Sequence, residues 1–344
     1  MNLHLCVPAL FWPDDLQADI YRHLELPALK TILAKGFRTE GTGRTTESWL
    51  CEMFNVAKQH DWPVAPITLR LDSGSAESEE KKYWLRVDPV HLRIENNHLL
   101  LGDSHILNIS LKEAISFTDS INELISADGL TLLPLHSDHW YLRCNQTPEL
   151  QTFLLSEAVG QNINDLLPHG NDSSIWNSRI NEIQMLLYDH SLNQAREARG
   201  ELAINSVWVW GGGVAPQKVH APYAGIWSNH GFVCALAKMG KIPCHALPEN
   251  AKELLQYSDS SGEQLVFLDN LQSFASYRDA FHWRNELVKI EQNWFVPLLE
   301  ALKKRQITRL KLTVIGKHST RNFMLTPRSL WKFWAAVHPL ESYS

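Results

Sequence analysis

Three consecutive glycines close an apolar stretch that carries two tryptophans. The segment Trp208-Val209-Trp210 is typical of a buried strand, and Gly211, Gly212 and Gly213 follow it directly. Backbone N–H groups that no side chain covers could form a concave nest for a phosphate. The run lacks the Lys-Ser/Thr of a Walker loop and the spacing of a dinucleotide fingerprint. An anion site and a tight strand-to-loop turn both remain open for this segment.

A cationic segment follows a strand predicted at residues 309–315. It reads Lys317-His318-Ser319-Thr320-Arg321 and could bind a phosphate or help to hold a metal. Metal sites for phosphoryl chemistry usually contain carboxylates, which bind hard cations and balance their charge. Here the neighbour of His318 is Lys317, whose charge repels a cation. The pattern favours anion binding or plain surface.

Sixteen histidines raise the question of metal chemistry. The segment His136-Ser137-Asp138-His139 offers two imidazoles and a carboxylate, but on a straight strand the two rings would point to opposite faces. We therefore expect no shared metal there unless the segment turns. Asp14, which follows the first strand, could bind a cation through its hard oxygens or could cap a helix.

The charge, the apolar runs and the cysteines of the chain argue against several classes of protein. The chain has 344 residues, 38 acidic and 32 basic residues, and a formal net charge of −6, which argues against a nucleic-acid binder. No apolar run reaches the length of a membrane span. The five cysteines form no CxxC pair, and the N-terminus lacks the basic flank of a signal peptide, so we expect a cytoplasmic protein.

The elements that would position these groups alternate along the chain. Apolar runs predict strands at residues 3–10, 202–210, 242–247, 264–268 and 309–315, and helical spacing predicts helices at 26–34, 47–58, 175–198, 229–239, 249–257 and 283–304. This alternation predicts an α/β fold with a mostly parallel sheet and helices on both faces. In such sheets ligands bind at the carboxyl ends of the strands.

A second module interrupts this pattern. The polar segment 72–82 precedes strands predicted at 83–94, 98–101 and 130–143 and a helix at 111–126, and a turn-rich segment at 170–174 follows them. We expect a small inserted α+β domain over residues 72–174 and a core domain made of residues 1–71 and 175–344.

Several segments, in order along the chain, resemble the cofactor-independent phosphoglycerate mutases of the archaeal type, which belong to the alkaline phosphatase superfamily. The strongest match joins His190–Arg196 to Ala203–Gly213, which look like the family's "HpvN…R" and "ANxIWxWGxG" motifs. The chain looks closer still to a proteobacterial branch labelled "regulatory protein, pathogenicity factor E type". The weaker matches are Leu26–Gly36, Gly160–Ile163 with Leu166–Pro168, Lys289–Glu291 and His318–Thr320.

The resemblance implies two divalent metals and a serine that is transiently phosphorylated, and the departures fall on those groups. Pro8-Ala9 occupies the position of the family's first metal-binding aspartate. Lys317 occupies the position of another metal-binding aspartate. The region of the nucleophile retains only threonines and Ser48, so Thr46 and Ser48 are the candidate remnants. Arg143 stands one residue from an arginine that meets the substrate.

We therefore expect a degenerate relative with no cofactor, a non-catalytic regulatory or anion-binding protein. Its ligand would be a phosphorylated or anionic small molecule in the cleft between the domains, held by Gly211, Gly212, Gly213, Lys317, His318 and Arg143. The alternative is a metal-dependent mutase or phosphatase with a rearranged site, in which Asp14, Asp269, Asp279, His282 and His318 hold Mn, Zn or Mg.

A third hypothesis is a surface for a protein partner or a second subunit. Trp331, Phe333 and Trp334 form an aromatic cluster near the C-terminus. Such a cluster can dock a partner. The alternative, which we favour, is that these rings pack on the chain's own sheet.

Overall fold

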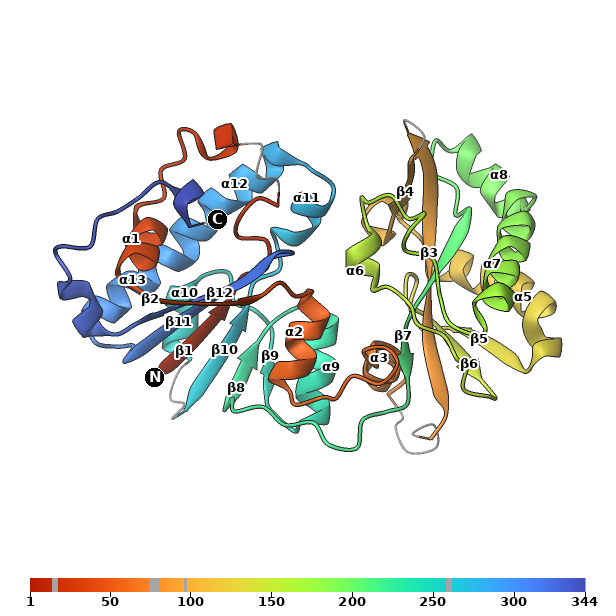
Figure 1. Ribbon diagram of the computed structural model, residues 1–344, viewed down its shortest axis with the longest axis horizontal. Coiled ribbons are helices and arrows are strands. Elements are labelled where there is room, and N and C mark those ends of the chain that lie inside the picture. Colours follow the sequence, from red (N-terminus) through yellow and green to blue (C-terminus); the bar gives the residue numbers. More distant parts are fainter. Residues whose placement is uncertain (14–17, 75–80, 96–97, 258–261, 344) are drawn as a thin grey trace. The chain divides into compact units, whose positions relative to one another are not determined.

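The computed structural model describes residues 1–13, 18–74, 81–95, 98–257 and 262–343, and it confirms the predicted α/β class (Figure 1). The chain divides into two compact units. The first joins Met1–Leu50 to His220–Ser344, and the second is the continuous segment Cys51–Val219. The domain boundaries predicted from the sequence, after residues 71 and 174, both lie inside this second unit.

The first unit is built on a mostly parallel sheet of seven strands. The central strand β1 (Asn2–Cys6) pairs in parallel with β10 (Glu263–Phe267) and with β11 (Arg309–Ile315). The sheet order is β2-β12-β11-β1-β10-β8-β9, in which β8 (Gly225–Trp227) and β9 (Cys244–His245) continue the parallel part. The edge strands β12 (Ser319–Leu325) and β2 (Phe37–Thr42) are antiparallel.

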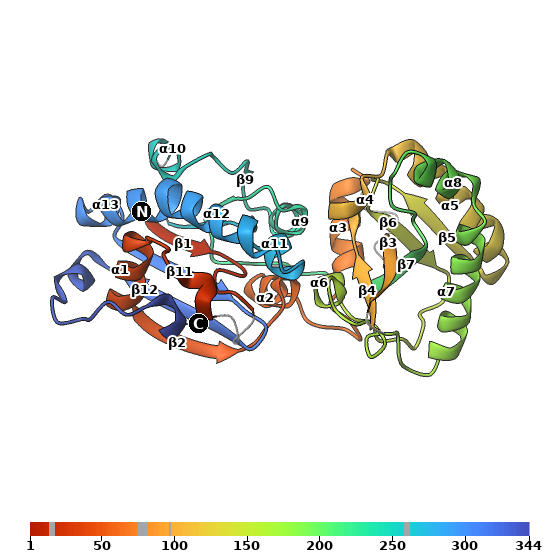
Figure 2. The same ribbon diagram turned by 90° about the horizontal axis from the view of Figure 1, so that it is seen from above.

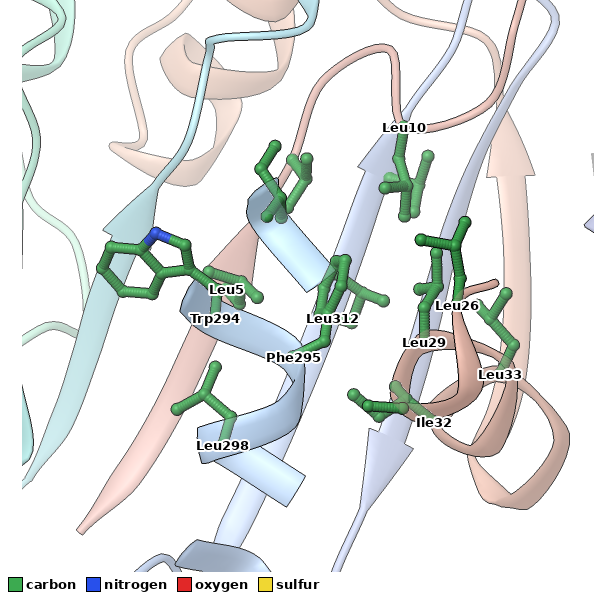
Figure 3. Close-up of a cluster of buried hydrophobic side chains, with 14 of the residues drawn as sticks. Leu5, Leu10, Leu26, Leu29, Ile32, Leu33, Trp294, Phe295, Leu298 and Leu312 are labelled. Atoms are coloured by element: carbon green, nitrogen blue, oxygen red, sulfur yellow. The ribbon is translucent and has the colours of Figure 1, made fainter. Parts of the chain in front are cut away.

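One face of this sheet carries the main hydrophobic core. Leu3 and Leu5 alternate along β1 with His4 and Cys6, so the two leucines face one side and His4 the other. Figure 3 shows Leu5 of β1 and Leu312 of β11 against side chains of α1 (Pro27–Lys35) and of the helical segment that contains Phe295 and Leu298. That segment comprises α12 (Ala280–Ile290), a π-helical turn (Glu291–Phe295) and α13 (Val296–Lys303).

Helices on the opposite face confirm that both faces are covered. Trp49 of α2 (Thr46–Met53) contacts His4 edge-on, with ring centroids 5.8 Å apart, and His230, which precedes α9 (Gly231–Met239), contacts Phe267 of β10. The remaining helical elements of this unit are short: 3-10 turns at Ala18–Tyr21, Pro327–Trp331 and Leu340–Ser342, α10 (Ala251–Gln256) and α11 (Gln272–Ser276).

The second unit contains an antiparallel sheet of its own (Figure 2). The long strand β3 (Tyr83–Glu95) pairs with β4 (His98–Gly102), β6 (Trp140–Cys144) and β7 (Ser206–Gly213), and β6 also pairs with β5 (Leu130–Pro134). Its helices are α3 (Val64–Asp72), α4 (Ser104–Leu107), α5 (Leu111–Ile125) with a 3-10 turn at Ser126–Asp128, α6 (Leu155–Ala158), α7 (Ser173–Tyr188) and α8 (Ser191–Ala198).

Two faces of β3 and β6 are buried by different helices. Phe117 of α5 and Trp176 of α7 pack with Leu85 and Leu142 of the sheet in one core. On the other side, α3 packs through Ala65 and Leu69 against Trp84 and Tyr141. Because helices cover the sheet on both sides, β7 is buried along its whole length, which explains why the sequence predicted it as a strand of the parallel sheet.

Three predictions about elements are wrong. The strand 202–210 was placed in the parallel sheet, but β7 is antiparallel to β3 in the second unit. The single strand 130–143 is a hairpin, because residues 135–138 bend between β5 and β6. The single helix 175–198 breaks at His190, whose Nδ1 accepts a hydrogen bond from the backbone N–H of Leu192 and begins α8.

Within the described ranges, no helix is both long enough and apolar enough to span a lipid bilayer.

Candidate functional site

The carboxyl ends of the parallel strands in the first unit lie side by side. In the pairing register, Cys6 of β1 stands beside Phe267 of β10 and Thr313 of β11. The chain after β1 continues along β11, because the backbone N–H of Val7 donates to Thr313 O and that of Ala9 donates to Ile315 O. Asp269 follows β10 at this edge, and Lys317 and His318 follow β11. This edge is the usual ligand position in open α/β sheets.

A close approach of Gly43 brings the candidate nucleophile segment to the same edge. A Cβ at Gly43 would lie 2.0 Å from the backbone oxygen of Lys317, so only glycine fits. The next residue, Arg44, donates its backbone N–H to Gly316 O at 3.3 Å. The structure therefore brings the start of α2, with Thr46 and Ser48, next to the turn that carries Lys317 and His318.

The hydroxyl groups at the start of α2 are held by local contacts. Thr45 Oγ1 accepts a hydrogen bond from the backbone N–H of Ser48 at 3.1 Å, and Ser48 Oγ donates to Thr45 O at 3.0 Å. Thr46 is buried, and its Oγ1 donates to Gln272 Oε1 at 3.1 Å. These are contacts of helix capping and packing, whereas an activated nucleophile needs a general base within reach.

Residues that the sequence suggested as metal ligands lie in different settings. Asp279 caps α12: its carboxylate accepts from the backbone N–H of His282 at 3.1 Å and lies 2.7 Å from His282 Nδ1. The hydrogen bond from that N–H lowers the pKa of Asp279. Asp269 is half-buried after β10, His318 is exposed, and Asp14 lies outside the described residues.

Only one group of three potential ligands gathers within the part of the chain that the structure describes. His136, Asp138 and His139 each offer one atom, and these atoms lie within 4.8 Å of one another. The expectation that the two imidazoles face apart is wrong, because the segment bends and the ring centroids lie 5.1 Å apart. Asp269, Asp279, His282 and His318 belong to no such group among the described residues.

Pro8-Ala9 stands where the resemblance places a metal aspartate. Ala9 has a φ of 54°, a conformation that is uncommon for residues other than glycine. Its backbone is held on both sides, because its N–H donates to Ile315 O at 3.1 Å and its carbonyl accepts from Trp283 Nε1 at 2.9 Å. The methyl group of Ala9 offers no ligand atom at this place.

The three consecutive glycines lie in β7, in the second unit, and are buried. A Cβ at Gly212 would lie 2.5 Å from Tyr83 Oη, and one at Gly213 would lie 2.8 Å from Gln59 Oε1. Close packing alone therefore accounts for glycine at both positions. The anion nest remains a prediction. Arg143 lies in β6 of the same unit and donates from Nη2 to Thr131 Oγ1 at 3.3 Å.

Residues that carry the strongest resemblance have structural roles in the second unit. Asn193 donates from Nδ2 to Leu187 O and Ile204 O and accepts at Oδ1 from the N–H of Ile204. Arg196 is fully buried and donates to Leu202 O and to Glu113 Oε1. These hydrogen bonds hold α8 against its neighbours. Asn193 and Arg196, which match the family's motif, therefore stabilise the fold in this chain.

A pair of cysteines was missed in the sequence. Cys234 of α9 and Cys244 of β9 lie with their Sγ atoms 3.2 Å apart, and both are half-buried. The hydrogen bond from Cys244 lowers the pKa of the Cys234 thiol to about 7, against the opposing effects of burial and of the Asp269 carboxylate. The only signal in the sequence was that the helix predicted at 229–239 and the strand predicted at 242–247 follow each other directly along the chain.

The aromatic cluster near the C-terminus is exposed, contrary to the expectation that it packs on the chain's own sheet. The exposed fractions of Trp331, Phe333 and Trp334 are 77%, 90% and 70%. Phe333 and Trp334 contact each other edge-on, with ring centroids 5.0 Å apart.

Comparison with known proteins gives a consistent likeness. The 2,3-bisphosphoglycerate-independent phosphoglycerate mutase of Methanosarcina mazei is 26% identical over 196 residues, which are 56% of this chain and 49% of the relative. The protein of the same name from Methanosarcina barkeri is 23% identical over 227 residues, 64% of this chain and 56% of the relative. The matches thus span about half the length of these curated relatives. No family model matches the chain.

Among solved structures, the PH0037 protein from Pyrococcus horikoshii has the same fold. It matches with a TM-score of 0.55 at 11% identity, over 94% of this chain and 87% of that one. The chain is a protein similar to the cofactor-independent phosphoglycerate mutases, with the α/β fold expected of that family.

Proposed function

We propose that this phosphoglycerate-mutase-like chain is a regulatory or ligand-binding protein that binds an anionic small molecule and does not turn it over. The binding site would lie at the carboxyl edge of the first unit's sheet. The observation that carries the proposal is the contact of Gly43 with the turn at Lys317, because it joins a cation and an imidazole to the start of α2. Lys317 and His318 are exposed and therefore accessible to a ligand.

The charge of this edge supports an anion rather than a metal. At two positions where the resemblance implies aspartate ligands, the chain has Pro8-Ala9 and Lys317. Phosphoryl transfer depends on electrostatic stabilisation of the transition state, to which a metal clamp contributes several kcal/mol. A lysine in place of a carboxylate removes a ligand and repels a divalent cation, while it attracts a phosphate or carboxylate.

The names of the relatives suggest the ligand to test first. A phosphoglycerate carries both a phosphate and a carboxylate, and Lys317 with the polar groups beside it offers donors for such an anion. We expect 3-phosphoglycerate to bind to the purified protein, as measured by isothermal titration calorimetry. Replacement of Lys317 by Gln should weaken binding about tenfold, the effect of losing one charge-assisted hydrogen bond.

The matched control is Lys304→Gln, which removes an exposed cation that follows α13. Its affinity for 3-phosphoglycerate should equal that of the unchanged protein. Absence of any binding, or equal loss in the two variants, would contradict the proposed site.

The enzyme hypothesis is tested separately by metal content and turnover. The protein is to be assayed with 3-phosphoglycerate and with p-nitrophenyl phosphate in the presence of Mn²⁺, Mg²⁺ or Zn²⁺. Turnover that disappears in Thr46→Ala or Ser48→Ala would show a working nucleophile and overturn the non-catalytic proposal. We expect no turnover above the rate with buffer alone.

A further inference from the structure

We propose that the loop between β5 and β6 is a binding site for a borderline transition-metal ion, with Zn²⁺ as the expected occupant. The ligands are the imidazoles of His136 and His139 and the carboxylate of Asp138. This site lies wholly in the second unit and is independent of the anion site proposed above. It consists of residues outside the metal set that the resemblance implies.

The ligand atoms already face one another. Asp138 Oδ1 lies 2.5 Å from His136 Nδ1 and 3.8 Å from His139 Nε2. Ligand atoms around a tetrahedral zinc ion, with bonds of about 2.0–2.2 Å, lie about 3.3 Å apart. The observed separations bracket this value, so shifts of side-chain rotamers in a surface loop are enough to admit the ion.

A fourth residue fixes the orientation of one imidazole. Asp72, the last residue of α3, accepts a hydrogen bond at Oδ2 from His139 Nδ1, with a separation of 3.0 Å. His139 Nδ1 therefore carries a proton, and Nε2 is the ring nitrogen that faces Asp138. Metal-bound histidines almost always donate the other ring N–H to a carboxylate, a backbone carbonyl or a water, which sets the tautomer and raises the basicity of the ligand nitrogen.

Asp72 is itself held in place. The hydroxyl of Tyr141 donates to the same Oδ2 at 2.6 Å. Burial acts to raise the pKa of Asp72, but the hydrogen bonds from His139 and Tyr141 help to bring it below its ordinary value. A chain of hydrogen bonds thus runs from the hydroxyl of Tyr141 through the carboxylate of Asp72 to the imidazole of His139. Such a chain holds the ring of His139 in one orientation.

The donor set selects the class of metal. Imidazole nitrogen suits zinc, copper, nickel and cobalt, whereas Mg²⁺ and Ca²⁺ prefer oxygen ligands. Three protein ligands leave one position of a tetrahedron for water. That position is reachable because the side chains of His136, Asp138 and His139 are 61%, 25% and 33% exposed. A bound ion would hold the β5–β6 loop, and through Asp72 it would stabilise the contact of that loop with α3.

Cobalt binding to the full-length protein tests the proposal without any assay of activity. After dialysis against EDTA, Co²⁺ is titrated and its visible d–d absorption is recorded, and Zn²⁺ is then added in competition. We expect one Co²⁺ per chain with the absorption of a four-coordinate ion, displaced by one equivalent of Zn²⁺. His136→Gln, Asp138→Asn and His139→Gln should each abolish this spectrum. Asp72→Asn should weaken binding about 10- to 100-fold, as loss of a partner behind a ligand does.

The matched control is His169→Gln, which removes an exposed imidazole of the same unit that bonds to Gln151. Circular dichroism verifies that every variant is folded. Absence of the Co²⁺ spectrum in the unchanged protein, or its persistence in His139→Gln and Asp138→Asn, would overturn the site. An Asp72→Asn affinity equal to that of the control would overturn the role of Asp72.

Discussion

His4 places a polar ring in the middle of the central strand. The residue is 1% exposed, and its two nitrogens lie 2.7 Å from Tyr223 Oη and 2.7 Å from Thr313 Oγ1. Because Thr313 Oγ1 donates its proton to Asn322 Oδ1, it must accept from His4 Nε2–H. Nδ1 then accepts from the Tyr223 hydroxyl. The neutral imidazole satisfies both contacts, whereas the protonated ring would lose the bond from Tyr223.

The stability of the protein should therefore fall as the pH is lowered through the unfolded-state pKa of His4. Burial, with the charges of Lys311 and Arg309, lowers the pKa of His4 well below its ordinary value of 6.5. Below about pH 6.5 the unfolded chain binds a proton that the folded chain rejects, so stability is lost as the pH falls. Between pH 7.5 and 5.5 this single group contributes about 1.4 kcal/mol of that loss.

Urea unfolding at pH 5.5, 6.5 and 7.5 measures this effect. In His4→Gln the fall in the free energy of unfolding should be smaller by the stated amount, while His190, whose pKa is also lowered by burial, still contributes. The control is His98→Gln, an exposed residue. If His4→Gln and the unchanged protein have parallel profiles, His4 does not titrate as inferred.

At the scale of elements, α1 begins without a capping side chain of its own. Leu26 occupies the cap position, and Pro27 follows it. The free N–H groups of Ala28 and Leu29 donate instead to the two oxygens of Glu291, at 2.6 and 2.9 Å. Glu291 is buried in the π-helical turn between α12 and α13, so one side chain connects two elements that are remote in the chain.

Removal of this carboxylate should destabilise the first unit. Glu291→Ala leaves two buried N–H groups without an acceptor, so we expect the free energy of unfolding to fall by about 2–3 kcal/mol. Glu291→Gln retains one oxygen acceptor and should lose less. Urea unfolding of both variants, with the exposed Glu300→Ala of α13 as the control, provides the measurement. Equal stability of Glu291→Ala and the control would show that water replaces the carboxylate.

Periodicity in the sequence predicted the long buried strands, but it missed the exposed strand β2 and also the largely buried elements α3 and β8. β1, β10 and β11 were predicted because their residues are apolar and buried. β2 was not predicted, since all six of its residues are exposed and the strand is held by pairing with β12 rather than by burial. The pairing of β7 with β3 also could not be predicted, because it depends on which apolar strands meet and not on their local pattern.

At the scale of the whole molecule, long-range contacts between the candidate residues could not be predicted from the sequence. Lys317 and the segment at Thr46 were assigned to one site only through the resemblance, and the contact of Gly43 joins them in the structure. The partner of His139 is Asp72, which lies 67 positions away in the chain. This contact depends on the packing of α3 against β6. The spacing of residues within one segment of the sequence does not predict such packing.

The boundaries of the second unit follow from which segments complete its core. Trp176, Ile180 and Ile183 of α7 and Val207 and Val209 of β7 are buried in the same core as α5 and β6. All five lie outside the range 72–174 that the turn-rich segments suggested. Polar segments therefore mark loops of this unit rather than its ends.

Two fragments distinguish these boundaries. Residues 51–219 include every described strand of the antiparallel sheet and the helices α3, α5 and α7 that cover it, so this fragment should fold by itself and unfold cooperatively in urea. Residues 72–174 lack α7 and β7. Burial of one large apolar side chain contributes about 1.5–3 kcal/mol, so loss of the five named above is comparable with the whole stability of about 5–15 kcal/mol that a domain has. This shorter fragment should give narrow amide dispersion in ¹H–¹⁵N spectra and no cooperative transition.

The longer fragment with Ile183→Ala is the control for sensitivity, and it should remain folded with a lower urea midpoint. A folded 72–174 fragment would support the boundaries predicted from the sequence and would mean that α7 and β7 add to a core that is already sufficient.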